Sequence, residues 1–380
     1  MRPRLLFISN LFPDASEPYR GLDNVTLLHL LRGHWDVRVV ALRPSLKSWI
    51  GGTPTWKARE EDAVLKPLFL PVRYVPKIGG LFNHKLILSA LNKALPAIGQ
   101  EFTYDIVLAS WLFPDGWAAI KAAKKPCVLI AQGSDVHGYL RSAPRKKAIL
   151  EAIDKSCGVI TRSRSLATLL ARAGAEATRL HPIHNGVDVS VFQPGERVLK
   201  PEKMVLFVGN LLPVKNPELL LRAFARLTTP ARLVIAGKGP LRQSLEALAT
   251  TLGIAERVQF LGPQLAPQIA EQMRSSDVLC MSSLNEGLPN VVIEAMASGL
   301  PVIATDVGGI HEVIDAPWKG TLVPSGDESA LAKALNDVLA NPLDRERIGA
   351  YGQGLSWQRT AQGYEEVLRQ AMCGRLSTLP

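Results

Sequence analysis

Short apolar segments alternate with amphipathic ones along the first half of the chain. Apolar runs of the length of a buried strand predict strands at Arg4–Ser9, Asp36–Leu42, Asp105–Ser110, Pro126–Gln132, Gly158–Ser163 and Arg179–Val187. Apolar positions three and four residues apart predict helices at Asn24–Leu31, Leu86–Ile98, Trp117–Ala123, Arg145–Asp154 and Leu166–Ala173. Strands separated by helices are typical of a parallel sheet covered on both faces.

The same alternation begins again at Met204. It predicts strands at Met204–Gly209, Arg232–Gly237, Arg257–Gly262, Val278–Ser282, Pro301–Val307 and Thr321–Pro324. Helical patterns return at Asp327–Leu339 and Leu355–Gln370. Two sets of six strands predict an α/β protein of two Rossmann-like domains that face each other across a cleft, although the halves show no clear sequence repeat.

Two stretches interrupt these patterns. Pro194-Gly195 and the charged residues that follow predict a linker, so we expect domains at 1–195 and 201–356. The stretch Arg43–Gly80 is rich in Pro and Gly and has weak periodicity, so we expect an excursion away from the sheet.

Composition indicates a soluble globular protein. Of the 380 residues 47% are hydrophobic and 21% charged, and no apolar run reaches the roughly 18 residues of a membrane span. The N-terminal apolar run is short, which predicts a first strand and not a signal peptide. The four cysteines are scattered without metal-ligand spacing, as expected for reduced thiols in a cytoplasmic protein.

Positive charge is concentrated in the first half. Residues 1–190 hold 26 Lys and Arg against 15 Asp and Glu, whereas residues 191–380 hold 18 against 19. A solvated basic face explains this excess, and so does attraction to an anionic membrane surface or to an acidic acceptor. No nucleic-acid-binding motif accompanies the charge, so nucleic acid is not expected as a partner.

The segment Ser282–Gly309 contains the carboxylates that are the strongest candidates for ligand binding. Pro289 favours the first turn of a helix and Gly299 predicts its end, so Glu294 falls within a short helix that is otherwise apolar. Glu286 lies eight residues earlier, in the loop before the helix. Two carboxylates around an anion-attracting helix N-terminus suit a ligand with hydroxyls and phosphate. A Glu in the first turns of a helix is also favourable without any ligand, so both interpretations stay open here.

The amino-acid sequence of this segment closely resembles the donor site of the family 4 glycosyltransferases, which are retaining enzymes of the GT-B fold. The match runs nearly unbroken over EGLPNVVIEAMASGLPVIATDVGG. The resemblance implies that Glu286 contacts hydroxyls of the donor sugar and that Glu294 holds the ribose diol of the nucleotide. Gly287, Leu288, Pro289 and Asn290 would complete this part of the donor site.

Further donor-site residues are implied by the same resemblance. Lys215, in GNLLPVKNP, matches a Lys that neutralises the leaving diphosphate, while Asn210 stands where an Arg is common. Gly262 would lie beside the base, and Gly21 in a glycine loop near the donor phosphates. The sequence has Gly-Leu there where many relatives have Gly-Gly. From the residue types alone, Gly21 can also be explained as a turn residue. Lys215 can also be explained as a surface cation beside a turn.

Two loops of the first half are expected on the acceptor side. Trp111–Gly116 and Ala131–Gly138 resemble segments of one branch of the family, the teichuronic-acid type. They supply Trp111, Asp135 and His137, for which an N-cap or Asx turn at Asp135 and a structural His are the alternatives. Many relatives carry a His at the position of Gln132, which His137 does not replace.

The resemblance covers nearly the whole chain and implies a helix at 357–380 that crosses back to the first domain. It implies a retaining glycosyltransferase that moves a sugar from a nucleotide-diphosphate sugar to a glycan or lipid-linked acceptor in cell-surface polysaccharide synthesis. We expect Lys215 and Glu286 as catalytic residues, no cofactor beyond the sugar nucleotide, no metal, and a cytoplasmic location, peripheral to the membrane. A sugar-nucleotide epimerase of the same fold and a non-catalytic sugar-nucleotide or polysaccharide binding protein are the alternatives.

Overall fold

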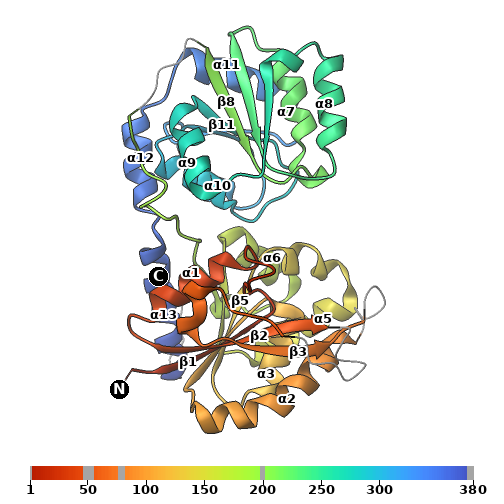
Figure 1. Cartoon of the computed structure of the whole chain (residues 1–380), viewed down its shortest axis with the longest axis vertical. Helices are drawn as coiled ribbons and strands as arrows, with labels where there is room; N and C mark the ends of the chain where they lie inside the picture. The colour runs from red at the N-terminus through yellow and green to blue at the C-terminus, as the bar shows by residue number, and fades with distance from the viewer. Residues whose placement is uncertain (1, 46–54, 76–81, 197–201, 375–380) are drawn as a thin grey trace. The chain divides into compact units, whose positions relative to one another are not determined.

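The computed structural model describes residues 2–45, 55–75, 82–196 and 202–374. The chain forms two compact units. The first unit consists of Met1–His184 with Thr360–Pro380, and the second of Asn185–Arg359. Each unit contains one parallel sheet with helices packed on it (Figure 1).

Seven parallel strands form the sheet of the first unit, in the order β3-β2-β1-β4-β5-β6-β7. They are β1 (Arg4–Ser9), β2 (Asp36–Ser45), β3 (Leu68–Arg73), β4 (Ile106–Ser110), β5 (Cys127–Ala131), β6 (Gly158–Thr161) and β7 (Leu180–Pro182). The helices are α1 (Leu22–Leu31), α2 (Asn83–Glu101), α3 (Trp117–Ala122), α4 (Ser134–His137), α5 (Ala143–Lys155) and α6 (Arg164–Ala173). From Thr360 on, α13 (Trp357–Met372) also belongs to this unit.

The second unit repeats this plan with six parallel strands, in the order β10-β9-β8-β11-β12-β13. They are β8 (Lys203–Val208), β9 (Ala231–Ala236), β10 (Val258–Gly262), β11 (Val278–Met281), β12 (Val302–Thr305) and β13 (Gly320–Val323). The helices are α7 (Pro217–Ala225), α8 (Arg242–Thr251), α9 (Ala266–Ser275), α10 (Asn290–Ala297), α11 (Glu328–Ala340) and α12 (Arg345–Gln353).

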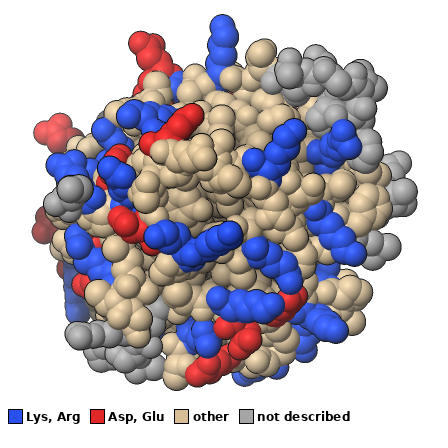
Figure 2. Space-filling view, turned by 90° about the horizontal axis from the view of Figure 1, so that it is seen from below, with Lys and Arg blue, Asp and Glu red and all other residues tan. Residues whose placement is uncertain are grey.

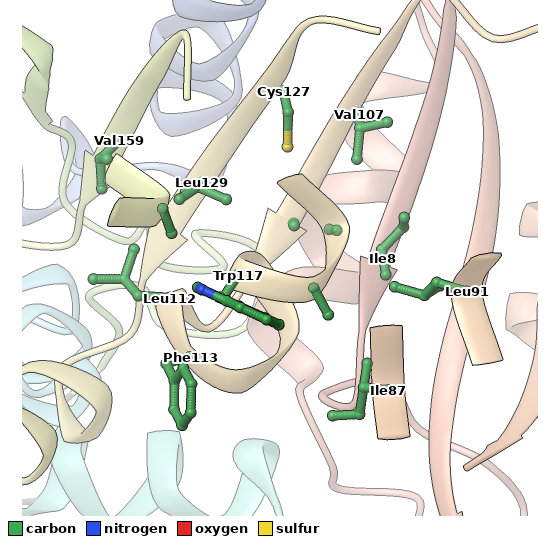
Figure 3. Packing of buried hydrophobic residues seen from close by; sticks show 14 of the residues in the cluster. Ile8, Ile87, Leu91, Val107, Leu112, Phe113, Trp117, Cys127, Leu129 and Val159 are labelled. Atoms are coloured by element: carbon green, nitrogen blue, oxygen red, sulfur yellow. The ribbon is translucent and has the colours of Figure 1, made fainter. Parts of the chain in front are cut away.

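Apolar side chains cover both faces of the central strands, which are buried almost throughout, whereas the edge strands β3 and β10 are more exposed. In the first unit Ile8, Val107 and Leu129 point from the sheet toward side chains of α2 and α3, among them Leu91 and Trp117 (Figure 3). In the second unit one core lies under α7, α8 and α11, and another under α9, α10 and α12. The loops at the carboxyl ends of the strands lie at one edge of each sheet, where α/β sheets bind ligands.

One predicted feature of the first half is wrong. The stretch Arg43–Gly80 was expected to leave the sheet, but Leu68–Arg73 forms β3, which pairs in parallel with β2. The prediction of six strands for this half therefore fails by one. Pro71 lies within β3 and weakens its strand pattern, yet a proline is tolerated at a sheet edge, where half of the backbone groups need no partner strand. Residues 46–54 and 76–81 of the same stretch lie outside the described residues.

The strand expected at Arg179–Val187 is also shorter than predicted. Only Leu180–Pro182 pairs with β6, and Ile183 N donates the last bond, to Thr161 O. The chain then turns toward Trp357, so closely that a Cβ at Gly186 would lie 2.2 Å from Trp357 N. Gly186 is therefore required by close backbone approach.

Candidate functional site

Three loops meet at the carboxyl edge of the second sheet. They follow β8, β11 and β12, which are neighbours in the strand order, and the order reverses between β8 and β11. Ser282 Oγ donates to Asn216 O at 2.8 Å, Leu284 N donates to Val214 O at 2.8 Å, and Thr305 Oγ1 donates to Ser283 O at 2.6 Å. The reversal of strand order is where α/β sheets bind ligands.

Lys215 and Glu286 lie together in this group of loops. Lys215 Nζ is 2.5 Å from Glu286 Oε1, and Ser283 Oγ donates to the same oxygen at 2.7 Å. The side chains are 22% and 10% exposed, so water screens this pair less than a surface pair. Lys215 has three N–H donors, and its pairing with Glu286 leaves two of them for another partner. The structure thus brings together the two residues predicted as catalytic.

Local sequence explains how Lys215 is presented. It closes a short 3₁₀ turn, Pro213–Lys215, and Asn216 next to it has φ 45°, in the left-handed region that Asn tolerates. Pro217 then begins α7, where its missing N–H costs nothing. The turn therefore places Lys215 directly before a helix start, beside the loop that carries Glu286.

A pair of glycines after β12 holds the Glu286 loop from its other side. Gly308 has φ 62°, and a Cβ there would lie 2.0 Å from Glu286 O. Gly309 N donates to Gly287 O at 2.5 Å. Sequence reasoning gave these glycines no role, although a Gly-Gly pair directly after a strand indicates close approach of another backbone.

Glu294 lies on the less buried side of α10. Val292, Ile293, Ala295, Met296 and Ala297 are buried, while Val291 and Glu294, three residues apart, are half-buried. Gly299 has φ 70° and follows the last turn, as predicted for a helix end. Pro289 is the residue before the helix and not part of its first turn, because its ψ of 129° is extended. Asn290, the first helical residue, accepts a bond from Asn185 Nδ2 at 2.9 Å.

The remaining predicted donor residues lie around the loops after β8 and β10. Asn210 is exposed directly after β8, whereas half-buried Gly262, with φ 74°, ends the edge strand β10. Gly237 joins these loops: its N–H donates to Gly262 O at 2.8 Å, and a Cβ there would lie 1.9 Å from Gly209 O. Leu288 and Gly287 are half-buried and Pro289 is buried beside α10.

Gly21, in the first unit, occupies a position that requires glycine. It precedes α1 with φ 68°, and a Cβ would lie 2.3 Å from Leu11 O. The close approach that demands glycine here is to its own loop. That loop is held by a buried ion pair, in which Arg43 Nε donates to Asp14 Oδ2 at 2.9 Å.

The predicted acceptor-side residues take different positions. Asp135 is fully buried and accepts N–H bonds from Leu112, Gln132 and Gly133 at 2.8–2.9 Å, so it ties the loops after β4 and β5 together. Burial raises the pKa of Asp135, and these backbone bonds oppose the rise. Trp111 is half-buried directly after β4, and His137 is half-buried at the end of α4.

Gln132 has internal partners of its own. Its Nε2 donates to Asn24 Oδ1 at 3.1 Å and to Ser110 Oγ. Asn24 is in turn held by Arg162 Nη2 at 3.2 Å. The position where many relatives carry a His is thus part of a hydrogen-bonded group inside the first unit.

Among the residues that the structure describes, no group of three or more His, Cys, Asp or Glu side chains could hold a metal ion. In the same part of the chain, no helix is both long and apolar enough to cross a membrane.

Two family models match consecutive parts of the sequence. "Glycosyltransferase Family 4" matches residues 26–191, and "Glycosyl transferases group 1" matches residues 192–354. Curated relatives include the D-inositol 3-phosphate glycosyltransferase of Nocardia farcinica, which is 33% identical over 292 residues, covering 69% of this chain and 64% of the relative. The protein of the same description from Mycobacterium marinum is 34% identical over 304 residues, covering 71% and 64%. The chain thus spans 64% of the length of these relatives.

Solved structures share the fold. HepE of Anabaena, in complex with UDP, has a TM-score of 0.74 at 19% identity, covering 97% of this chain and 100% of that one. Sucrose-phosphate synthase from Thermosynechococcus elongatus has a TM-score of 0.74 at 22% identity, covering 97% and 99%. With the two parallel sheets, these likenesses confirm the predicted α/β fold of two Rossmann-like domains.

Replacing Gly308 should damage the Glu286 loop. In Gly308→Ala a Cβ would collide with Glu286 O, in addition to the roughly 1–2 kcal/mol that an L side chain costs in the left-handed region. Gly326 is a matched control, because it has φ 81° but nothing within 4 Å of an added Cβ. Thermal denaturation should show a clearly larger loss for Gly308→Ala than for Gly326→Ala. Equal losses would mean that the contact with Glu286 does not constrain the loop.

Proposed function

The chain belongs to the family 4 glycosyltransferases and has their GT-B fold, and from this premise we propose that it transfers a sugar from a nucleotide-diphosphate sugar to an acceptor hydroxyl. The observation that carries the proposal is the Lys215–Glu286 pair at the reversal of strand order, beside the helix that bears Glu294. HepE, of the same fold, has been solved with UDP and with UDP-glucose, which supports a sugar nucleotide as the ligand.

Each side chain of the donor site has a separate role in this proposal. Glu294, half-buried on α10, accepts hydrogen bonds from the ribose hydroxyls, and Glu286 accepts them from the sugar. The two free donors of Lys215 and the N–H groups at the start of α10 face the diphosphate, where negative charge grows as the sugar leaves. Gly262 lies beside the base, and exposed Asn210 stands where an Arg would add a second phosphate contact.

The reaction in this proposal retains the configuration of the sugar and needs no metal. The bond from the anomeric carbon to the diphosphate oxygen breaks, and the acceptor oxygen bonds to the same face of that carbon. The acceptor proton passes to the leaving phosphate, so no enzymatic nucleophile is required. Lys215 and the α10 N-terminus then stabilise the departing charge in place of a cation.

The acceptor in this proposal is a glycan or a lipid-linked glycan of cell-surface polysaccharide synthesis, reached from the cytoplasmic side of the membrane. The first half of the chain supplies the basic residues that would face anionic lipid. Seen from below, the molecule displays Lys and Arg side chains in several groups, with acidic side chains among them (Figure 2). The finer resemblance to the teichuronic-acid type stays a prediction.

A comparison of nucleotide release separates the transferase from its alternatives. With a sugar nucleotide, a transferase should release nucleotide faster when acceptor extract is added. An epimerase would convert the sugar without needing acceptor, and a binding protein would release nothing.

Lys215→Ala should lower turnover by about 100-fold while weakening donor binding less, because the charge that Lys215 meets grows only as the bond breaks. The control is Lys203→Ala, which removes a Lys paired with Asp277 at the first residue of β8, the opposite end of that strand. Steady-state kinetics should leave the control near wild type. A raised KM with unchanged kcat would limit Lys215 to binding ground-state phosphate.

Titration with the nucleotide alone should distinguish the roles of Glu294 and Glu286. Glu294→Gln should weaken binding of free nucleotide-diphosphate about tenfold or more, because hydrogen bonds to a charged group are worth roughly 1.5–3 kcal/mol each. Glu286→Gln should leave that affinity nearly unchanged and lose activity with the full donor. Calorimetric titration decides between the roles, and equal losses in both variants would return Glu294 to a structural role.

Binding to the membrane should depend on charge. Co-sedimentation with liposomes should require anionic lipid and should fall steeply as salt rises from about 0.05 to 0.5 M, because the Debye length shortens over this range. Neutral liposomes are the control. Salt-independent binding, or none to anionic liposomes, would leave solubility as the use of the basic half.

A further inference from the structure

Two consecutive serines follow β11 directly, where the strand ends beside the Lys215–Glu286 pair. Ser282 and Ser283 are both fully buried, so each hydroxyl needs a partner within the protein. Side chains of consecutive residues in an extended chain point to opposite sides, and the two hydroxyls engage different segments. Ser282 bonds to the loop after β8, whereas Ser283 bonds to Glu286 in its own loop.

Ser283 is the serine that contacts the carboxylate. Its Oγ donates to Glu286 Oε1 at 2.7 Å, and Lys215 Nζ donates to the same oxygen at 2.5 Å. Among the described residues, these are the hydrogen bonds that the Glu286 carboxylate accepts, and both end on Oε1. Oε2 is therefore the oxygen left to accept a bond from a ligand.

The backbone of Ser283 is itself held by the sheet. Thr305, the last residue of β12, is fully buried, and its Oγ1 donates to Ser283 O at 2.6 Å. β12 pairs in parallel with β11. Ser283 is thus tied to two central strands, so its hydroxyl reaches Glu286 from a well-supported position.

Ser282 holds the other partner of the pair within reach. Its Oγ lies 2.8 Å from Asn216 O and 3.2 Å from Lys215 O, so its single proton is shared between the two carbonyls. Asn216, with its left-handed φ of 45°, follows the turn that presents Lys215. The two serines therefore connect the end of β11 to both members of the pair, Ser282 through the backbone and Ser283 through the side chain.

A main-chain bond already holds the loop that carries Glu286. Leu284 N donates to Val214 O at 2.8 Å and so ties this loop to the one after β8. The Ser283 hydroxyl has a different partner, because its bond goes to the Glu286 side chain, which is 10% exposed. This choice of partner indicates that the orientation of the carboxylate depends on Ser283 more than the path of the loop does.

We propose that Ser283 is a positioning residue of the donor site, which orients Glu286 for the donor sugar. With Oε1 engaged by Ser283 and Lys215, rotation of the carboxylate is restricted, and Oε2 faces the ligand before the donor arrives. A side chain already held in its binding orientation loses less conformational entropy on binding, so affinity for the sugar rises. The assignment of Glu286 to the sugar rests on the proposed function, whereas the effect on binding is measured without any transfer.

The test measures how much of the affinity the sugar contributes. Wild type and Ser283→Ala are titrated by calorimetry with UDP-glucose, UDP-N-acetylglucosamine, GDP-mannose and the free nucleotide-diphosphates. For the sugar nucleotide that wild type binds most tightly, Ser283→Ala should weaken binding about fivefold and leave its free nucleotide-diphosphate nearly unchanged. An unchanged affinity for the sugar nucleotide, or an equal loss for the nucleotide-diphosphate, would overturn the proposal.

Ser276→Ala is the matched control. Ser276 is also fully buried, and its Oγ donates to Gln272 O at 2.7 Å near the opposite end of β11. Each replacement removes one buried hydroxyl bond, so thermal denaturation should show similar losses of stability, but only Ser283→Ala should weaken the sugar nucleotide. Equal weakening in both variants would mean that the hydroxyl acts through the stability of the fold, against the proposal.

A double-mutant cycle shows whether Ser283 acts through Glu286. In a Glu286→Ala background there is no carboxylate to orient, so adding Ser283→Ala should leave the affinity for the sugar nucleotide unchanged. Losses that simply add in the double variant would assign the Ser283 hydroxyl to another task and overturn the proposal.

Transfer is assayed separately with the same proteins, so that the two proposals fail in different ways. Coupled binding through Ser283 and Glu286, without nucleotide release when acceptor extract is added, would count against the transferase and support the role of Ser283. Transfer by wild type, with equal sugar-nucleotide affinity in wild type and Ser283→Ala, would overturn the role of Ser283 and leave the transferase in place.

Discussion

Parallel pairing of every strand is the constraint on which both units depend. In a parallel sheet all carboxyl ends lie at one edge, so loops that are far apart in sequence become neighbours. In the second unit this brings Lys215, after β8, within 2.5 Å of Glu286, after β11. In the first unit it brings Asn10, after β1, into hydrogen bonds with Asp115, after β4. Helices cannot occupy this edge, because they cover the faces.

The two units stabilise these loops with different chemistry. In the second, backbones approach each other closely, and glycines at 237 and 308 leave no room for a Cβ. In the first, buried carboxylates take backbone and amide N–H groups: Asp135 accepts three, and Asp14 accepts from Ser16 and Glu17 while pairing with Arg43. Close backbone approach of this kind brings main-chain N–H groups near one another, which is a feature of sites that bind anions.

Burial separates the carboxylates of the first unit into two kinds. Asp135 is buried and accepts hydrogen bonds from backbone N–H groups of the loops that it joins, so it stabilises these loops. Asp115 has one satisfied oxygen and one without a partner among the described residues, so burial leaves part of its hydrogen-bonding capacity unused. This difference is invisible in sequence, where both are Asp residues in Pro- or Gly-containing loops after strands.

The sequence alone determined the α/β class, the alternation of strands and helices, and the short helix that carries Glu294, because these depend on local periodicity and on Pro and Gly positions. Local patterns failed at β3, whose proline obscures a strand that its pairing with β2 stabilises. Tertiary structure alone decided that Ser283 and Lys215 share one oxygen of Glu286, that Gly308 bounds that loop, and that Asp115, Trp111 and His84 line one cavity. These are contacts between segments far apart in the chain, and strand order, which local sequence does not encode, places them together.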